Sequence, residues 1–166
     1  MPLSLSNSNM PNRCGTTPYT PPVEDEMSQI NYAGVLKGGV VAALIMNISE
    51  FVLNVPIAGA QMDRELAARN LPPVAAGAIV AFTTLTLLLG FLTVWLYAAI
   101  RPRLGPGPRT AMIAGLVVWA TTYLYSAIAF GVLGINSMGL VVLTIVWTLI
   151  EMIVASAAGA YFYNEA

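Results

Sequence analysis

The sequence contains no histidine and only one cysteine among its 166 residues, and charged side chains make up only 9% of it. Without histidine, the chain lacks the commonest metal and haem ligand and the easiest general base, so neither a metal site nor a cofactor is expected. The single cysteine, Cys14, excludes a disulfide within the chain and is expected to be a free thiol. A net charge of −1 offers no basic surface, so nucleic acid is not an expected partner.

Apolar residues dominate what is present. They make up 57% of the chain, and the mean hydropathy is +0.74. Apolar runs of about 20 residues are long enough to cross the roughly 30 Å of hydrocarbon in a lipid bilayer. The sequence therefore predicts an all-α, polytopic membrane protein that folds as an antiparallel bundle of four transmembrane helices. The expected crossings are about Tyr32–Ala58, Val74–Ile100, Ala111–Leu133 and Leu140–Tyr163.

The chain divides into two parts. Residues 1–29 are rich in Ser, Asn, Pro and Thr, so we expect a disordered tail ahead of a transmembrane domain at residues 30–166. Met27 stands ahead of the first crossing, so translation from Met27 instead of Met1 is an alternative that the sequence leaves open. After the first crossing, "GAQMDRELAARNLPP" predicts a short interfacial helix, with Pro72 and Pro73 opening the second crossing.

The segment "IRPRLGPGPRT" places three arginines, Arg101, Arg103 and Arg109, between the second and third crossings. Its prolines and glycines predict a break in the helix, and Thr110 is expected to be the N-cap of the third crossing. Four crossings put this loop and both termini on one side, which carries five Lys and Arg residues against two on the other. Because cytoplasmic loops carry the excess of Lys and Arg, we expect this side to be cytoplasmic. The rival interpretation, a site for anionic lipid headgroups, is weaker because three arginines fall short of the usual four to eight.

Two stretches, "GGVVAALIMNISEFVLNVPIAG" and "AGLVVWATTYLYSAIAFGVLG", begin alike, which is a weak signal for two repeated helical hairpins. The segments "WLYAAIRPRLGPGPRTAMIAGL", "MNISEFVLN" and "WTLIEMIVASAAGAYFY" also resemble a group of small bacterial four-helix integral membrane proteins of unknown function. The resemblance covers about residues 29–165 and departs in the tail before Met27. It implies a multi-pass protein of the bacterial inner membrane and supplies no activity or site residue.

Two acidic residues lie deep within the expected crossings. Glu50 is thirteen residues beyond Lys37, and Glu151 is twelve residues before Tyr163, so each lies about 18–20 Å along its helix, near the bilayer midplane. A charge at that depth costs at least about 2.5 kcal/mol, so each carboxyl should face protein or water and be protonated or paired.

Polar and small residues recur at helical spacing on each crossing, which predicts four inward faces around the two glutamates. The faces are Ala43, Asn47, Glu50 and Asn54 on the first; Thr83, Thr86, Gly90, Thr93 and Tyr97 on the second; Thr121, Thr122, Tyr125 and Ser126 on the third; and Thr144, Thr148, Glu151, Ala155 and Ala158 on the fourth. From these we predict a ligand or proton site at Glu50, Glu151, Asn47, Asn54, Thr148 and Tyr125.

Two functional hypotheses follow from this pattern. In the first, the two carboxyls at matched depth bind or conduct protons or a small polar ligand. In the second, they are neutral acids that hydrogen-bond to Asn47, Asn54, Thr148 or each other, and the protein is a structural or accessory subunit of a membrane complex or a homo-oligomer. No nucleotide-binding loop, metal cluster or serine nucleophile motif is present, so the sequence does not predict an enzyme. The residual enzymatic hypothesis is an intramembrane acid that acts on lipid.

Overall fold

The structure is a computed structural model that describes residues 30–163, so the predicted tail, Cys14 and Met27 lie outside the described residues. Its elements are α1 (Tyr32–Val52), the π-helical turn η1 (Leu53–Ile57), α2 (Gly59–Ala68), α3 (Ala76–Leu104), α4 (Pro108–Trp119), the π-helical turn η2 (Ala120–Leu124), α5 (Tyr125–Val132) and α6 (Met138–Phe162). Four helical spans, at Tyr32–Ile57, Ala76–Leu104, Pro108–Val132 and Met138–Phe162, are long and apolar enough to cross a membrane. In hydrocarbon a helix satisfies its own backbone polar groups, which explains why these runs fold as they do.

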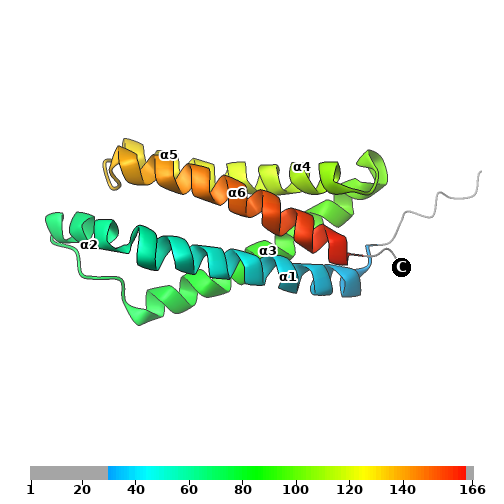
Figure 1. Cartoon of the computed structure of the whole chain (residues 1–166), viewed down its shortest axis with the longest axis horizontal. Coiled ribbons are helices and arrows are strands. Elements are labelled where there is room, and N and C mark those ends of the chain that lie inside the picture. Colours follow the sequence, from blue (N-terminus) through cyan, green and yellow to red (C-terminus); the bar gives the residue numbers. More distant parts are fainter. Residues whose placement is uncertain (1–29, 164–166) are drawn as a thin grey trace, which may run out of the picture.

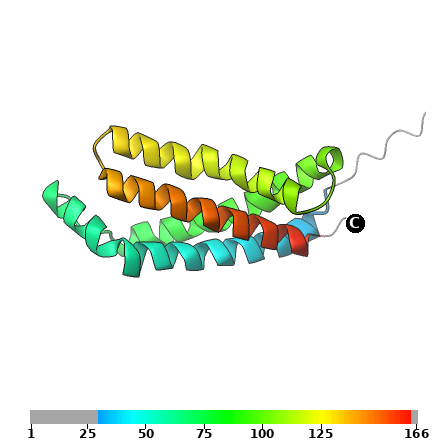
Figure 2. The same cartoon turned by 45° about the horizontal axis from the view of Figure 1, so that its top comes forward.

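The four spans run antiparallel in a bundle, as the sequence predicts (Figures 1 and 2). α1 packs against α3 and α6, and α4 packs against the same two helices. The start of α1, the end of α6 and the loop between α3 and α4 lie at one end, here called the arginine-loop end, and α2 and the α5–α6 turn lie at the other, the α2 end (Figure 1). The first and second spans form one hairpin, and the third and fourth spans form another. The links within the two hairpins differ, because α2 joins the first and second spans, whereas a short turn joins the third and fourth.

Several predicted boundaries shift in the structure. Pro72 and Pro73 do not open the second crossing, because they lie outside any helix and α3 begins at Ala76. α3 also runs past Ile100 to Leu104, with Pro102 inside its last turn. Thr110 is not an N-cap: Gly107 is the N-cap of α4, and the Thr110 hydroxyl instead donates to the Gly105 carbonyl at 2.7 Å.

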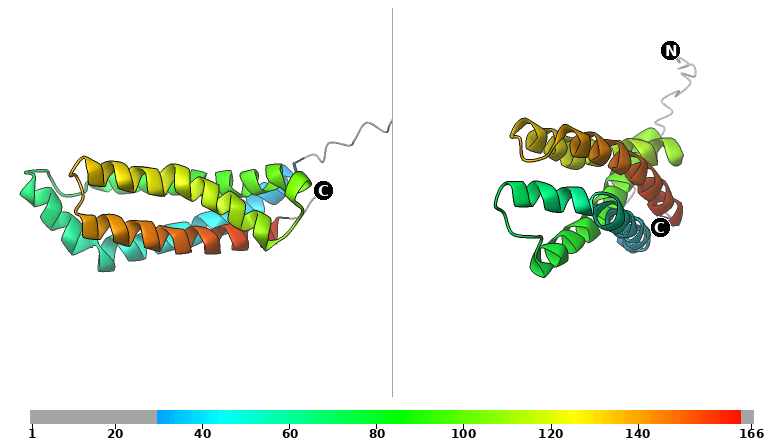
Figure 3. Two further views of the ribbon diagram at one scale, coloured as in Figure 1. Left: turned by 90° about the horizontal axis from the view of Figure 1, so that it is seen from above. Right: turned by 60° about the vertical axis from the view of Figure 1, so that its left-hand side comes forward.

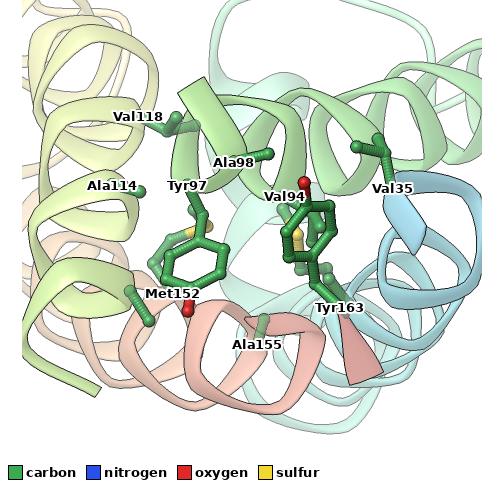
Figure 4. Packing of buried hydrophobic residues seen from close by; sticks show 12 residues of the cluster. Val35, Val94, Tyr97, Ala98, Ala114, Val118, Met152, Ala155 and Tyr163 are labelled. Atoms are coloured by element: carbon green, nitrogen blue, oxygen red, sulfur yellow. The ribbon is translucent and has the colours of Figure 1, made fainter. Parts of the chain in front are cut away.

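The densest packing lies toward the arginine-loop end. Val94, Met152 and Ala155 are buried there beside the edge-to-face pair of Tyr97 and Tyr163, whose ring centroids are 5.8 Å apart (Figure 4). Glycines let the backbones approach: a Cβ on Gly90 would lie 2.6 Å from the Ala43 backbone, and one on Gly38 would meet the Gly159 carbonyl. Small residues at such contacts are the usual means of close helix packing in membranes.

The α2 end is more open (Figure 3). α2 lies beside the start of α6, where the backbone N–H of Ser137 donates to Glu65 at 3.0 Å and Arg69 donates to the Gly134 carbonyl at 2.6 Å. Hydrogen bonds from the Ser137 hydroxyl, its backbone N–H and Gln61 lower the pKa of Glu65. These interactions join the first hairpin to the second at this end of the molecule.

The first part of α3, residues 76–89, is here called the free half of α3. None of these residues is buried, whereas Gly90, Thr93, Val94, Tyr97 and Ala98 of the same helix are. The free half diverges from the other spans toward the α2 end (Figure 3). Thr83, predicted to face the interior, is therefore exposed, because its helix leaves the bundle beyond Gly90.

Candidate functional site

Glu50 on α1 and Glu151 on α6 approach the same tyrosine, Tyr123 of η2. The Tyr123 hydroxyl donates to Oε1 of Glu151 at 3.4 Å and also lies beside the carboxyl of Glu50. The two carboxyls are close enough to interact electrostatically. The structure thus places the two acidic groups on a shared polar centre, a proximity that their matched depth permits but that the sequence alone does not establish.

The two carboxyls differ in their surroundings. Glu151 is only 4% exposed, and its Oε2 atom has no hydrogen-bond partner among the described residues. Glu50 is half-buried, and its Oε2 accepts a 2.6 Å hydrogen bond from the Asn54 carboxamide. A buried polar atom without a partner is costly and uncommon, so a proton on this carboxyl would be favoured, and the Ser49 hydroxyl of α1 also faces the carboxyl.

Asn54 is positioned by the end of the first span. Pro56 has no N–H, so the Val52 carbonyl loses its usual donor and the helix widens into η1, closed by a hydrogen bond from Ala58 to the Leu53 carbonyl at 2.8 Å. Within this segment the Asn54 amide nitrogen also donates to the Glu50 backbone carbonyl at 2.9 Å. The side chain therefore binds both the carboxyl and the backbone of Glu50, which fixes the carboxyl's orientation.

Tyr125 does not belong to the site, contrary to the sequence prediction. Its side chain is 72% exposed and faces away from the glutamates. The cause is η2, whose π-helical turn contains one more residue than an α-helical turn. The side chains of η2 and α5 are therefore rotated relative to the buried face of α4, which Ala111, Ala114 and Val118 form. A regular α-helix would extend that face to Tyr125, whereas the wider turn brings Tyr123 inward and buries Ala127.

Asn47 and Thr148 lie near the glutamates but do not hydrogen-bond to them. The Asn47 amide donates to the Ala43 carbonyl at 2.9 Å. The Thr148 hydroxyl donates to the Thr144 carbonyl at 2.7 Å and accepts from the Trp119 indole at 3.1 Å. Of the predicted partners, only Asn54 binds a carboxyl, and it does so while also donating to its helix backbone, as the other two do.

The sequence analysis missed Tyr123 and Ser49. The Ser49 hydroxyl accepts from the Trp147 indole at 2.9 Å and faces the carboxyl of Glu151. Ser49 stands beside Glu50 in the sequence, and a buried tryptophan in an apolar span needs a hydrogen-bond partner. The sequence therefore weakly indicated that Ser49 could accept from Trp147 near the glutamates. It did not indicate Tyr123, because the direction of that side chain depends on the π-helical turn.

The three arginines that flank the connection between α3 and α4 are far from the site: Arg101 and Arg103 lie in the last turn of α3, and Arg109 lies in the first turn of α4. Arg101 lies with its guanidinium carbon 5.6 Å from the ring centroid of Tyr163, while Arg103 and Arg109 are exposed. The Tyr97 hydroxyl accepts a hydrogen bond from the Gly107 amide at 3.3 Å, which ties the loop to α3. These arginines therefore cap the bundle at one end and do not compensate the glutamates.

Within residues 30–163 no three His, Cys, Asp or Glu side chains gather in a way that could hold a metal ion. The polar centre consists of two carboxyls, a phenol, a hydroxyl and a carboxamide, which suit proton exchange or a small polar ligand. Comparison with known protein families, curated proteins and solved structures finds no match for this chain. The functional argument therefore depends on the geometry of the centre itself.

Proposed function

We propose that this protein binds and transfers protons within the membrane through Glu50, Tyr123 and Glu151. The observation that supports the proposal is the environment of Glu151, which is almost fully buried with one carboxyl oxygen bonded to Tyr123 and the other without a partner. A charged carboxylate in hydrocarbon costs at least about 2.5 kcal/mol, which favours a bound proton at this position.

The arrangement supplies a path for a proton between the two carboxyls. Two carboxylates close together repel each other, so the pair retains at least one proton. When Glu50 carries it, the acid donates that proton to the Tyr123 oxygen while the phenolic proton passes to Glu151. The hydroxyl is regenerated, Glu50 becomes a carboxylate and Glu151 a neutral acid. Asn54 stabilises the carboxylate left on Glu50 by donating to it.

The test is proton flux in reconstituted vesicles carrying a pH-sensitive dye. Glu50→Gln and Glu151→Gln should each lower the flux at least tenfold while leaving folding unchanged, because an amide keeps the shape but cannot exchange the proton. Glu65→Gln, which changes an acid on α2 outside the spans, is the matched control and should leave flux intact. Equal flux in wild type and both site variants would reject the proposal.

The accessory-subunit hypothesis predicts a different result. If the polar faces only hold helices together, wild-type vesicles carry no more proton flux than empty ones, and the protein copurifies with a stable larger complex. Stoichiometric recovery of such a partner, together with absent flux, would establish that alternative.

We also propose that the protein resides in the bacterial inner membrane with both termini and the arginine loop facing the cytoplasm. The support is the excess of Lys and Arg at the arginine-loop end, where Arg101 and Arg103 lie in the last turn of α3 and Arg109 lies in the first turn of α4. The polar centre would then be nearer to the periplasmic surface than the tightly packed core is.

A further inference from the structure

The stripe of α1 that faces α3 becomes polar toward the α2 end. A Cβ on Gly39 would meet Phe91 of α3, and Ala43 lies against Gly90, so these two positions define the stripe. Asn47, Glu50 and Asn54 follow Ala43 at spacings of four, three and four, which keeps them on the same face. Asn47 and Glu50 are half-buried and Asn54 is exposed. The α3-facing stripe is therefore polar and incompletely covered where α3 has diverged.

The free half of α3 carries hydroxyls at the matching depth. Thr86 and Thr83 lie four and seven residues from Gly90, just as Asn47 and Glu50 lie four and seven from Ala43. Because the helices are antiparallel and meet where Gly90 contacts Ala43, equal offsets give about equal depth. Thr84 donates to the Val80 carbonyl at 2.8 Å, as hydroxyls on lipid-facing helices commonly do. No hydrogen bond from Thr83 or Thr86 occurs within residues 30–163.

Hydrocarbon is a poor covering for this polar stripe, because polar and ionisable groups at membrane depth face protein or water. The chain's own α3 separates from α1 beyond Gly90, and α3 makes no substantial contact with η2 or α5. The polar stripe of α1, formed by Asn47, Glu50 and Asn54, and the free half of α3 are thus two uncovered surfaces at the same depth in the membrane. The polar stripe bears a carboxyl and carboxamides, and the free half bears hydroxyls.

We infer that two copies of this chain pair in the membrane, with the free half of α3 from each copy packed on the polar stripe of α1 in the other. A twofold axis along the membrane normal keeps both copies in the same orientation, so matched depths within one chain are matched between chains. Thr83 of each copy then lies next to Glu50 of the other and completes the wall of its polar centre. The inference concerns assembly and does not require that the centre transfer protons.

Cysteine cross-linking between two differently tagged full-length copies tests the pairing, with Cys14→Ser in both. One matched pair combines Asn47→Cys in one copy with Thr86→Cys in the other, and a second combines Asn54→Cys with Ile79→Cys. Asn47→Cys with Ile79→Cys is the mismatched control, offset by seven residues or about 10 Å. After oxidation with copper phenanthroline in native membranes, each matched pair should give at least tenfold more mixed-tag disulfide dimer than the control.

Three results would overturn the inference. The first is no more mixed-tag dimer from matched pairs than from the control. The second is a disulfide that forms only within single chains carrying both Asn47→Cys and Thr86→Cys, which would mean that α3 covers its own α1. The third is labelling of Asn47→Cys by a membrane-impermeant maleimide as fast as Arg109→Cys, which would mean that water covers the stripe. Because none of these readouts measures flux, a failure here is distinguishable from a failure of the proton proposal.

Discussion

Tyr123 holds a position between two acidic groups that no other described side chain shares. Its hydroxyl contacts both carboxyls and can accept and donate a proton in the same step, while its ring packs with the core. Tyr125, two residues later, has the same chemistry and none of the contacts. A comparison of variants at Tyr123 and Tyr125 therefore separates the effect of a hydroxyl that contacts the glutamates from the effect of any tyrosine hydroxyl in this span.

We expect Tyr123→Phe to lower proton flux at least tenfold in reconstituted vesicles, because the ring and its packing remain while the exchangeable proton is lost. Thermal unfolding in detergent should change little. Tyr125→Phe is the matched control and should retain full flux, since its hydroxyl faces outward. A Tyr123→Phe protein with unchanged flux would mean that protons pass between the glutamates by another route.

At the scale of the helices, the sequence predicts some features of the spans and not others. Apolar length predicts all four crossings, and Glu50 and Glu151 are found from the cost of charge at depth. The inward side chains beyond Trp119 could not be found this way, because periodicity arguments assume 3.6 residues per turn and η2 departs from it. Nor could the divergence of α3, since the free half has the same apolar composition as a packed helix.

Close backbone approach at Gly90 should contribute strongly to the stability of the α1–α3 contact. A Cβ there would lie 2.6 Å from backbone atoms of Ala43, which cannot move aside without shifting the helix. We expect Gly90→Ala to destabilise the bundle by about 1–3 kcal/mol, measured by unfolding in SDS–detergent mixtures.

Gly77 provides the control in the same helix, because a Cβ there meets nothing within 4 Å. Gly77→Ala should be neutral or slightly stabilising, since alanine is the better helix former. Equal effects from the two substitutions would show that the helices do not approach as closely as the structure indicates.

At the scale of the whole molecule, the arginine loop should determine orientation. Replacing Arg101, Arg103 and Arg109 with alanine leaves two basic residues, Arg13 and Lys37, on that side and two, Arg64 and Arg69, on the other. Because the charge bias that orients the spans is then gone, we expect a single population of oriented chains to become a mixture of both orientations.

Labelling of a single cysteine on α2 measures this outcome. With Cys14→Ser and Asp63→Cys, an impermeant maleimide should label α2 from one side of the membrane alone when the three arginines are present, and from both sides in the triple variant. Retained one-sided labelling in the triple variant would assign orientation to other features of the chain.

The contact between α2 and the start of α6 also has a consequence for biosynthesis. Glu65 and its partner Ser137 are 72 residues apart, so α2 leaves the ribosome well before the amide that binds it exists. At about 5–20 residues per second, roughly 4–14 s pass before that partner is made. α3 and α4 are synthesised during this interval, while α2 still lacks its final neighbours. The start of α6 thus completes the attachment of the earlier α2, and the arrangement at that end forms only once Ser137 has been synthesised.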